Sequence, residues 1–187
     1  MSRLKLFMAI LGCKPIGRHT EQHDIFFGIA SQISELVPAM YEYWPEADKK
    51  IHIDAWREVS QVDGFDIMIL PATEKENGLS PKLFFINLGG YKPGEFEEFH
   101  YKLLLVANHK GEAIAKAKNT AFYKHTGFEG AVSHVDDKYG VDVDDFFEIQ
   151  DILSEEIKNR FCIQLEKAKI IKEDSLHIGY FPLSKIS

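Results

Sequence analysis

The sequence predicts an α+β (or α/β) protein made of two tandem strand-strand-helix-strand-strand repeats, which form a pseudo-two-fold sandwich of sheets and helices. Residues 5–30 recur without a gap as residues 82–107, and such a period indicates internal repetition. In each copy, two short apolar runs typical of buried strands precede a segment of helical period. Nine pairs are identical, namely Lys5/Lys82, Leu6/Leu83, Phe7/Phe84, Leu11/Leu88, Gly12/Gly89, Gly17/Gly94, Glu21/Glu98, His23/His100 and Ala30/Ala107.

The first copy opens with two predicted strands, Lys5–Gly12 and His23–Ala30. Both are short and almost wholly apolar. Pro15 and Gly17 mark the loop over residues 13–22 as a turn region. We therefore expect the two strands to pair in antiparallel fashion.

A helix is predicted after the second strand. Ser31 is a suitable N-cap, and apolar residues recur at helical spacing as far as Trp44. Pro45 ends the pattern. Pro38 should bend this helix or separate its first turn, because proline cannot donate an interior backbone hydrogen bond.

Two further strands complete the first copy. Lys50–Val59 alternates in polarity, and Phe65–Leu70 is apolar. Asp63-Gly64 between them predicts a tight turn. Residues 71–81, which carry proline at both ends, are predicted to be the linker that ends copy one (residues 1–70).

The second copy, residues 82–150, repeats the plan, and residues 151–187 add a C-terminal helix and a β-hairpin in what we expect to be one compact domain. An acidic turn is predicted at Asp142–Asp145, and the helix should stop at Gly127. The other predicted elements are strands Lys82–Gly89, His100–Ala107, Ala131–Asp136 and Phe146–Ile149, helices Gly111–His125 and Asp151–Asn159, and strands Phe161–Lys167 and Leu176–Phe181.

Composition limits the classes of function. The 187 residues are 45% hydrophobic and carry a net charge of −7, which argues against nucleic-acid binding and against an anionic membrane surface. No apolar stretch has the length of a signal or transmembrane segment. Cys13 and Cys162 do not match in the repeat, so we expect two reduced thiols in a cytoplasmic protein.

The first two strands of each copy are apolar on both faces. Helices can cover one face, and the other face needs the sister copy or a second subunit. A homodimer is therefore one expectation.

Polar residues recur at fixed places in the repeat. If the helix makes a parallel crossover, the second and third strands begin at the same edge of the sheet. That edge would gather the pairs Glu21/His23 and His52/Asp54, with Arg18 and His19 nearby in the loop. The equivalent set in the second copy is Glu98, His100, His134 and Asp136.

Two imidazoles and two carboxylates suit a divalent-metal site, which we predict from Glu21, His23, His52 and Asp54. They equally suit acid–base chemistry, or a structural role in which they anchor the loop. The glycine-rich loops could expose backbone amides to a small anion. The sequence thus favours a binding or structural protein, and the alternative is a metal- or small-anion-dependent, hydrolase-like enzyme.

The phrases Leu-Phe-Met-Ala-Ile-Leu-Gly, Arg-His-Thr-Glu-Gln-His-Asp, His-Ile-Asp-Ala-Trp-Arg-Glu-Val and Leu-Phe-Phe-Ile-Asn-Leu-Gly-Gly-Tyr-Lys-Pro-Gly resemble a bacterial family. This family is catalogued as domain of unknown function 1543, a short domain that occurs once or twice per chain. The resemblance covers most of residues 5–150. It implies a bacterial, cytoplasmic protein and agrees with a duplication, but it implies no activity, cofactor or catalytic residue.

Overall fold

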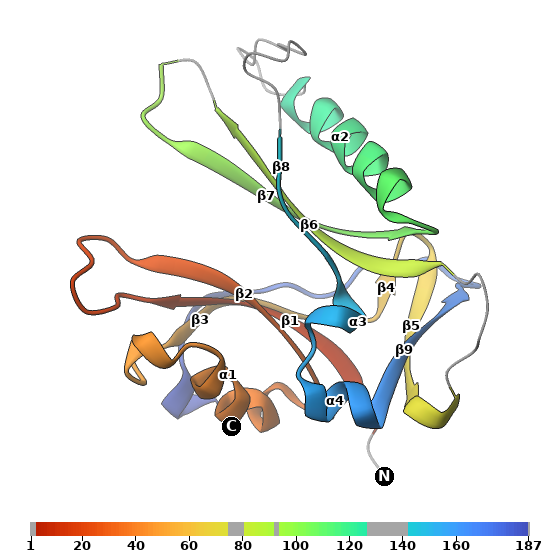
Figure 1. Cartoon of the computed structure of the whole chain (residues 1–187), viewed down its shortest axis with the longest axis horizontal. Helices are drawn as coiled ribbons and strands as arrows, with labels where there is room; N and C mark the ends of the chain where they lie inside the picture. Colours follow the sequence, from red (N-terminus) through yellow and green to blue (C-terminus); the bar gives the residue numbers. More distant parts are fainter. Residues whose placement is uncertain (1–2, 75–80, 92–93, 127–141, 187) are drawn as a thin grey trace. The chain divides into compact units, whose positions relative to one another are not determined.

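The computed structural model describes residues 3–74, 81–91, 94–126 and 142–186. It combines strands and helices, as predicted, and arranges the strands in three sheets (Figure 1). The chain forms two compact units: unit 1 is Met1–Lys75 with Leu153–Ser187, and unit 2 is Glu76–Ile152. The predicted strand 131–136 and the predicted helix stop at Gly127 lie outside the described residues. No helix in the described ranges is long and apolar enough to cross a membrane.

A four-stranded antiparallel sheet forms the centre of unit 1. Its order is β10-β3-β1-β2. The predicted hairpin is confirmed, because Lys5 lies opposite Ala30 and Cys13 lies opposite Gln22. Both β2 and β3 run antiparallel to β1 and begin where β1 ends. The strands are β1 (Lys5–Cys13), β2 (Gln22–Ala30), β3 (His52–Val59) and β10 (His177–Pro182).

The connection from β2 to β3 is helical but interrupted. It consists of η1 (Ile33–Leu36), α1 (Val37–Tyr43) and η2 (Pro45–Ala47). Pro38 lies in the first turn of α1, so it separates the predicted first turn from the rest of the helix, as expected.

Ser31 does not cap this segment. The N-cap is Gln32, which makes no side-chain capping bond, and the backbone N–H of Ser31 instead donates to Glu35 Oε2 at 3.0 Å. The predicted cap was wrong because the acidic side chain of Glu35 reaches back to satisfy the donor in front of the helix.

Both faces of β1 are buried in the chain. Phe7 and Ala9 face the core that includes Met40 of α1, and Leu6 and Met8 on the other face are also buried. The expected homodimer stays a prediction.

A small second sheet in unit 1 has the order β4-β5-β9. Asp63 and Gly64 adopt φ values of 51° and 77°, which confirms the predicted tight turn, since such hairpin turns require positive φ. The strands are β4 (Gln61–Val62), β5 (Phe65–Pro71) and β9 (Phe161–Lys167), and η3 (Ala72–Glu74) and η4 (Leu183–Lys185) are short helical turns.

The predicted helix over residues 151–159 is in fact two helices, α3 (Ile149–Ile152) and α4 (Glu155–Arg160). Ser154 starts the second one, because its side-chain oxygen accepts a hydrogen bond from the backbone N–H of Ile157 at 3.4 Å.

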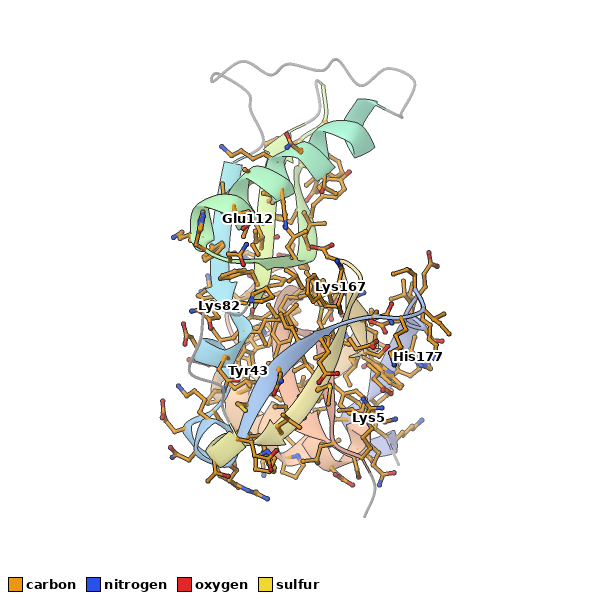
Figure 2. All side chains as sticks on the ribbon, turned by 90° about the vertical axis from the view of Figure 1, so that its right-hand side faces the viewer. Lys5, Tyr43, Lys82, Glu112, Lys167 and His177 are labelled. Atoms are coloured by element: carbon orange, nitrogen blue, oxygen red, sulfur yellow. The ribbon has the colours of Figure 1, made fainter. Side chains whose placement is uncertain are left out.

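Unit 2 contains an antiparallel sheet of order β7-β6-β8 and helix α2, on which Figure 2 marks Glu112. Phe84 and Ile86 of the sheet pack with Ala113 and Ala117 of the helix. The elements are β6 (Lys82–Tyr91), β7 (Glu98–Ala107), α2 (Lys110–Thr126) and β8 (Asp142–Glu148).

The predicted acidic turn at Asp142–Asp145 was wrong, whereas the predicted strand Phe146–Ile149 is confirmed for residues 146–148. Residues 142–148 form one continuous strand, which takes the third position of the unit beside β6. Acidic residues fit this strand because Asp145 accepts a hydrogen bond from Asn87 Nδ2 at 3.1 Å. Asp144 is the extra residue of β8 at a register shift between β6 and β8.

Candidate functional site

Four of the predicted site residues of unit 1 lie together at one rim of the sheet. Glu21 immediately precedes β2 and His23 is its second residue, whereas His52 and Asp54 are the first and third residues of β3. Gly12, near the end of β1, lies directly opposite both His23 and His52. The rim cluster, Glu21, His23, His52 and Asp54, therefore forms because β2 and β3 start beside the end of β1.

In the rim cluster, imidazoles and carboxylates alternate around a ring. His52 Nε2 lies 3.1 Å from Glu21 Oε1 and 3.2 Å from Asp54 Oδ1. His23 Nε2 lies 3.2 Å from Asp54 Oδ2 and 3.8 Å from Glu21 Oε2. Each carboxylate thus uses one oxygen for each imidazole.

These short separations are not hydrogen bonds by their geometry. Asp54 Oδ2 is buried and has no hydrogen-bond partner among the described residues, although His23 Nε2 is 3.2 Å away. A ring N–H that pointed at this oxygen would satisfy it. The cluster therefore holds its nitrogen and oxygen atoms close together while Asp54 Oδ2 accepts no hydrogen bond from the described residues.

Gly12 leaves room for this arrangement. A Cβ at this position would lie 2.5 Å from both Asp54 Oδ2 and His52 Nε2. The two side chains thus occupy the space that any other residue would fill, and the glycine forms the floor of the rim cluster.

The members of the cluster differ in exposure. The His52 side chain is 7% exposed, whereas the side chains of Glu21 and His23 are 46% and 45% exposed. Tyr180 of β10 lies over the His52 ring, with 4.3 Å between ring centroids. One imidazole is consequently fixed under the edge strand, and the other faces solvent.

The next residue on β1, Cys13, is a buried free thiol. Its pKa is raised, chiefly by burial and further by the negative charges of Glu21 and Glu46. Cys162 is likewise buried and outside any disulfide, and its thiol donates to the carbonyl oxygen of Pro71 at 3.5 Å. A thiol that resists ionisation is a poor metal ligand.

Arg18 and His19 lie in the loop between β1 and β2 and are exposed. The ion pairs described for the cluster do not include either side chain. The predicted neighbourhood of six residues is therefore a cluster of four with an exposed cationic loop beside it.

In unit 2, Glu98 and His100 occupy the start of β7 and lie beside Asp144 of β8. His100 Nε2 is 3.3 Å from Asp144 Oδ2. One ligand atom from each of the three residues can be chosen so that all lie within 4.8 Å of one another. The predicted partners His134 and Asp136 lie outside the described residues.

The predicted set for unit 2 did not include Asp144, because its members were chosen by the spacing His-x-Asp alone. In the strand register, Asp142 lies opposite Gly89 as His52 lies opposite Gly12. A gapped comparison of β3 with β8 would have matched Asp54 to Asp144 and Glu58 to Glu148. Tyr180 gave no signal, because its contact with His52 depends on strand pairing.

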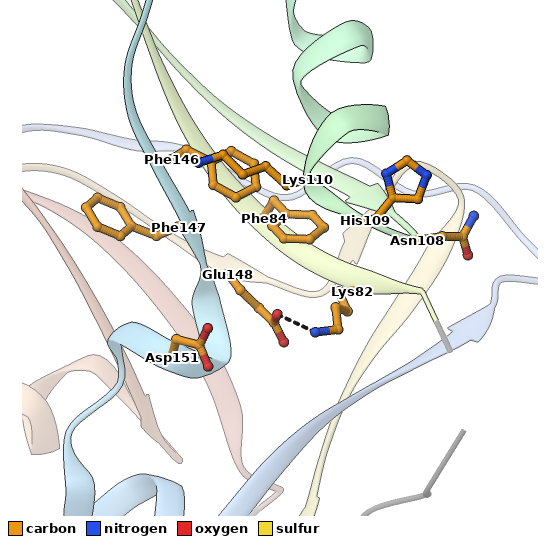
Figure 3. A pocket seen from close by; sticks show the side chains of 9 residues that line it. All are labelled: Lys82, Phe84, Asn108, His109, Lys110, Phe146, Phe147, Glu148 and Asp151. Carbon is orange, nitrogen blue, oxygen red and sulfur yellow. Dashed lines mark hydrogen bonds and ion pairs between the residues drawn. The ribbon is translucent and has the colours of Figure 1, made fainter. Parts of the chain in front are cut away.

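The opposite end of each sheet carries a groove, of about 420 Å³ in unit 2 (Figure 3) and 470 Å³ in unit 1. In unit 2, Lys82 Nζ pairs with Glu148 at 2.6 Å, which raises the pKa of the lysine. In unit 1, Lys5 Nζ pairs with Glu58 at 2.8 Å. Each groove is therefore lined by one of these ion pairs.

The rim cluster has two chemical uses. Imidazole nitrogens and carboxylate oxygens are ligands for a divalent transition metal, and the half-exposed side would leave a coordination position open to water. Without a metal, a carboxylate beside an imidazole can fix its tautomer and orient it for proton transfer.

Comparison with known proteins supports the resemblance seen in the sequence. The family described as Domain of Unknown Function (DUF1543) matches residues 18–69, which contain the whole rim cluster. No curated protein matches the chain. Among solved structures, the crystal structure of a protein Il1583 from Idiomarina loihiensis has a TM-score of 0.61 and 22% identity, and the match covers 97% of this chain and 99% of that chain. At this identity, the likeness concerns the fold alone.

Proposed function

We propose that the protein binds metal and that the rim cluster of unit 1 holds a divalent transition-metal ion. The observation that carries the proposal is the set of three imidazole–carboxylate separations of 3.1–3.2 Å. Around an ion with bonds of about 2.0–2.2 Å, neighbouring ligand atoms lie roughly 3.0–3.5 Å apart. Each of these pairs therefore has the spacing of two neighbouring ligands. The complete set is wider, since within the described part of the chain only the unit 2 group of Glu98, His100 and Asp144 brings one ligand atom from each of three residues within 4.8 Å of one another.

The competing account is a ring of imidazolium–carboxylate ion pairs that braces the loop. In that ring, each N–H should point at an oxygen, yet Asp54 Oδ2 has no hydrogen bond within the described part of the chain. His52 is also buried beneath Tyr180 of the edge strand, which holds its ring in one position. Two imidazoles favour zinc, copper, nickel or iron over magnesium or calcium.

Binding requires only small movements of the exposed members. Each carboxylate contacts the two imidazoles through different oxygens, so the ligand atoms must draw inward to share one ion. Glu21 and His23 are about half exposed and can turn without disturbing the core. His52 is held in place by Tyr180 and supplies the fixed ligand.

The proposal includes the tandem repeat, because the same elements recur in both units. Each unit has a three-stranded antiparallel core with one register shift. The shift lies at Asp54 in β3 of unit 1 and at Asp144 in β8 of unit 2. We infer that unit 2 is a second copy of the plan with a changed third strand. A cytoplasmic location in a bacterium agrees with the two free cysteines.

The direct test is elemental analysis of the full chain, purified without a histidine tag or chelator. We expect about one equivalent of a transition metal in the wild type after incubation with zinc, and at least tenfold less in His23→Ala/His52→Ala, since both nitrogen ligands are lost. Asp54→Asn, which keeps the shape of the side chain, should also reduce the metal content.

His19→Ala is the matched control, because it removes an exposed imidazole of the adjacent loop and should leave the metal content unchanged. The proposal fails if the wild type takes up no metal while the folded double variant melts at a lower temperature. That pair of results would show that the ring braces the loop.

A further inference from the structure

The rim of unit 2 carries a second group of potential ligands, and its chemistry differs from that of unit 1. Glu98, His100 and Asp144 each offer a ligand atom, and the three atoms lie within 4.8 Å of one another. The group joins the start of β7 to the register shift of β8, so it depends on tertiary pairing rather than on one exposed loop.

A glycine makes room for this group as well. The carboxylate of Asp144 occupies the place where a Cβ on Gly89 would be. Gly89 is opposite Asp142, and Asp144 is the extra residue at the register shift between Asn87 and Leu88. Asp144 thus uses the space above a glycine, as Asp54 does above Gly12.

A separate observation concerns a buried acceptor on the same face of the sheet as this group. Asn87 lies two residues before Gly89 and therefore on the same face of β6. Its Nδ2 donates to Asp145 Oδ2 at 3.1 Å, which turns its carbonyl oxygen away from that carboxylate. This Oδ1 is buried and accepts no hydrogen bond from any residue that the structure describes. A buried acceptor without a donor is stabilised by a cation or by a water molecule bound to one.

The donor set predicts the class of ion. Unit 2 offers one imidazole and two carboxylates, and Asp142 takes the register position that His52 holds in unit 1. Oxygen-rich sites suit manganese and magnesium, whereas a second imidazole favours zinc. We propose that unit 2 holds a second divalent cation of the harder, manganese-like class at Glu98, His100 and Asp144, independently of the unit 1 site.

The test uses the untagged full chain after removal of metal with a chelator. Electron paramagnetic resonance follows free Mn²⁺ as it is titrated with protein, because bound Mn²⁺ loses the sharp signal. We expect saturable binding of one Mn²⁺ in the wild type and binding at least about tenfold weaker in Asp144→Asn, since even second-shell changes cost tenfold or more.

Two matched variants make the same change of charge. Asp145→Asn alters the adjacent carboxylate, which accepts from Asn87, and Asp54→Asn alters the unit 1 cluster. Both should bind Mn²⁺ within about twofold of the wild type. Circular dichroism melts establish that each variant is folded.

Three outcomes would overturn the proposal: no saturable Mn²⁺ binding, equal losses in Asp144→Asn and Asp145→Asn, or loss in Asp54→Asn alone. The second would indicate diffuse attraction to acidic groups, and the third would place Mn²⁺ in unit 1. Zinc content separates this proposal from the proposed function, because Asp144→Asn should leave the zinc of unit 1 in place.

Discussion

The two units have the same three-stranded core but differ in what surrounds its rim. In unit 1, a fourth strand, β10, covers the buried His52 with Tyr180. In unit 2, the described sheet has three strands, and Glu98, His100 and Asp144 are all exposed. The comparison teaches that one backbone plan can present a partly buried group with two imidazoles or an open group with one. The two groups differ in the residue opposite the glycine and in the presence of an edge strand.

The glycines under the two rims should respond unequally to alanine. In Gly12→Ala the new Cβ meets buried His52, which cannot move, so we expect a loss of about 1–3 kcal/mol in the free energy of unfolding. In Gly89→Ala it meets only the Asp144 carboxylate, which is 30% exposed and can turn outward, so the loss should stay below about 1 kcal/mol. Urea denaturation measures both, and equal losses would contradict the difference in rigidity.

The second prediction concerns a substitution that makes the rim of unit 2 resemble the rim of unit 1. Asp142→His places an imidazole opposite Gly89, at the register position of His52. We expect zinc affinity at unit 2 to rise by about tenfold or more, because imidazole is a better ligand for zinc than carboxylate. Calorimetry in an Asp54→Asn background isolates unit 2. The idea that the two units share one backbone plan for their rims is refuted if Asp142→His leaves zinc affinity unchanged while Mn²⁺ still binds.

The smallest expected effect concerns the starts of the two helical segments. Glu112 of α2 accepts from the backbone N–H of Asn108 at 3.0 Å and pairs with Lys116 at 2.8 Å. These contacts, with Lys116 the largest cause, lower its pKa to about 2. Glu35 in unit 1 has a lowered pKa through the Ser31 hydroxyl and N–H.

A lowered folded-state pKa adds stability above the unfolded value, and this stability is lost as the pH falls toward the folded value. For Glu112, the loss should span the pH range from the ordinary carboxyl pKa of 4.5 down to about 2. Carboxyl NMR titration should show Lys116→Met raising the pKa of Glu112, whereas Lys118→Met, the same change on an exposed side chain of α2, should not. An unchanged Glu112 midpoint in Lys116→Met would contradict the assignment of the cause.

The sequence predicted the hairpins and the meeting of Glu21, His23, His52 and Asp54 because these depend on local patterns. Apolar runs define β1 and β2, and a parallel crossover necessarily places the starts of β2 and β3 at one edge. The contacts among the four residues follow from that placement. Whether they bind a metal stays a prediction.

The third strand of unit 2 could not be predicted in the same way. Asp-Val-Asp-Asp resembles a turn, because acidic residues are rare in strands. Pairing with β6 overrides this preference. Asn87 donates a hydrogen bond to Asp145, and the register shift places Asp144 above Gly89. The stacking of Trp56 on His177, 3.8 Å between centroids, likewise comes from segments far apart in the sequence.

The central claim is that two imidazoles and carboxylate oxygens bind one ion at the rim of unit 1. Zinc K-edge X-ray absorption on Asp144→Asn loaded with one equivalent of zinc tests it most directly, because unit 2 is then disabled. The account predicts a first shell of nitrogen and oxygen at about 2.0–2.2 Å with the outer-shell scattering of two imidazoles. A sulfur shell at about 2.3 Å, or an oxygen shell without imidazole scattering, would contradict it.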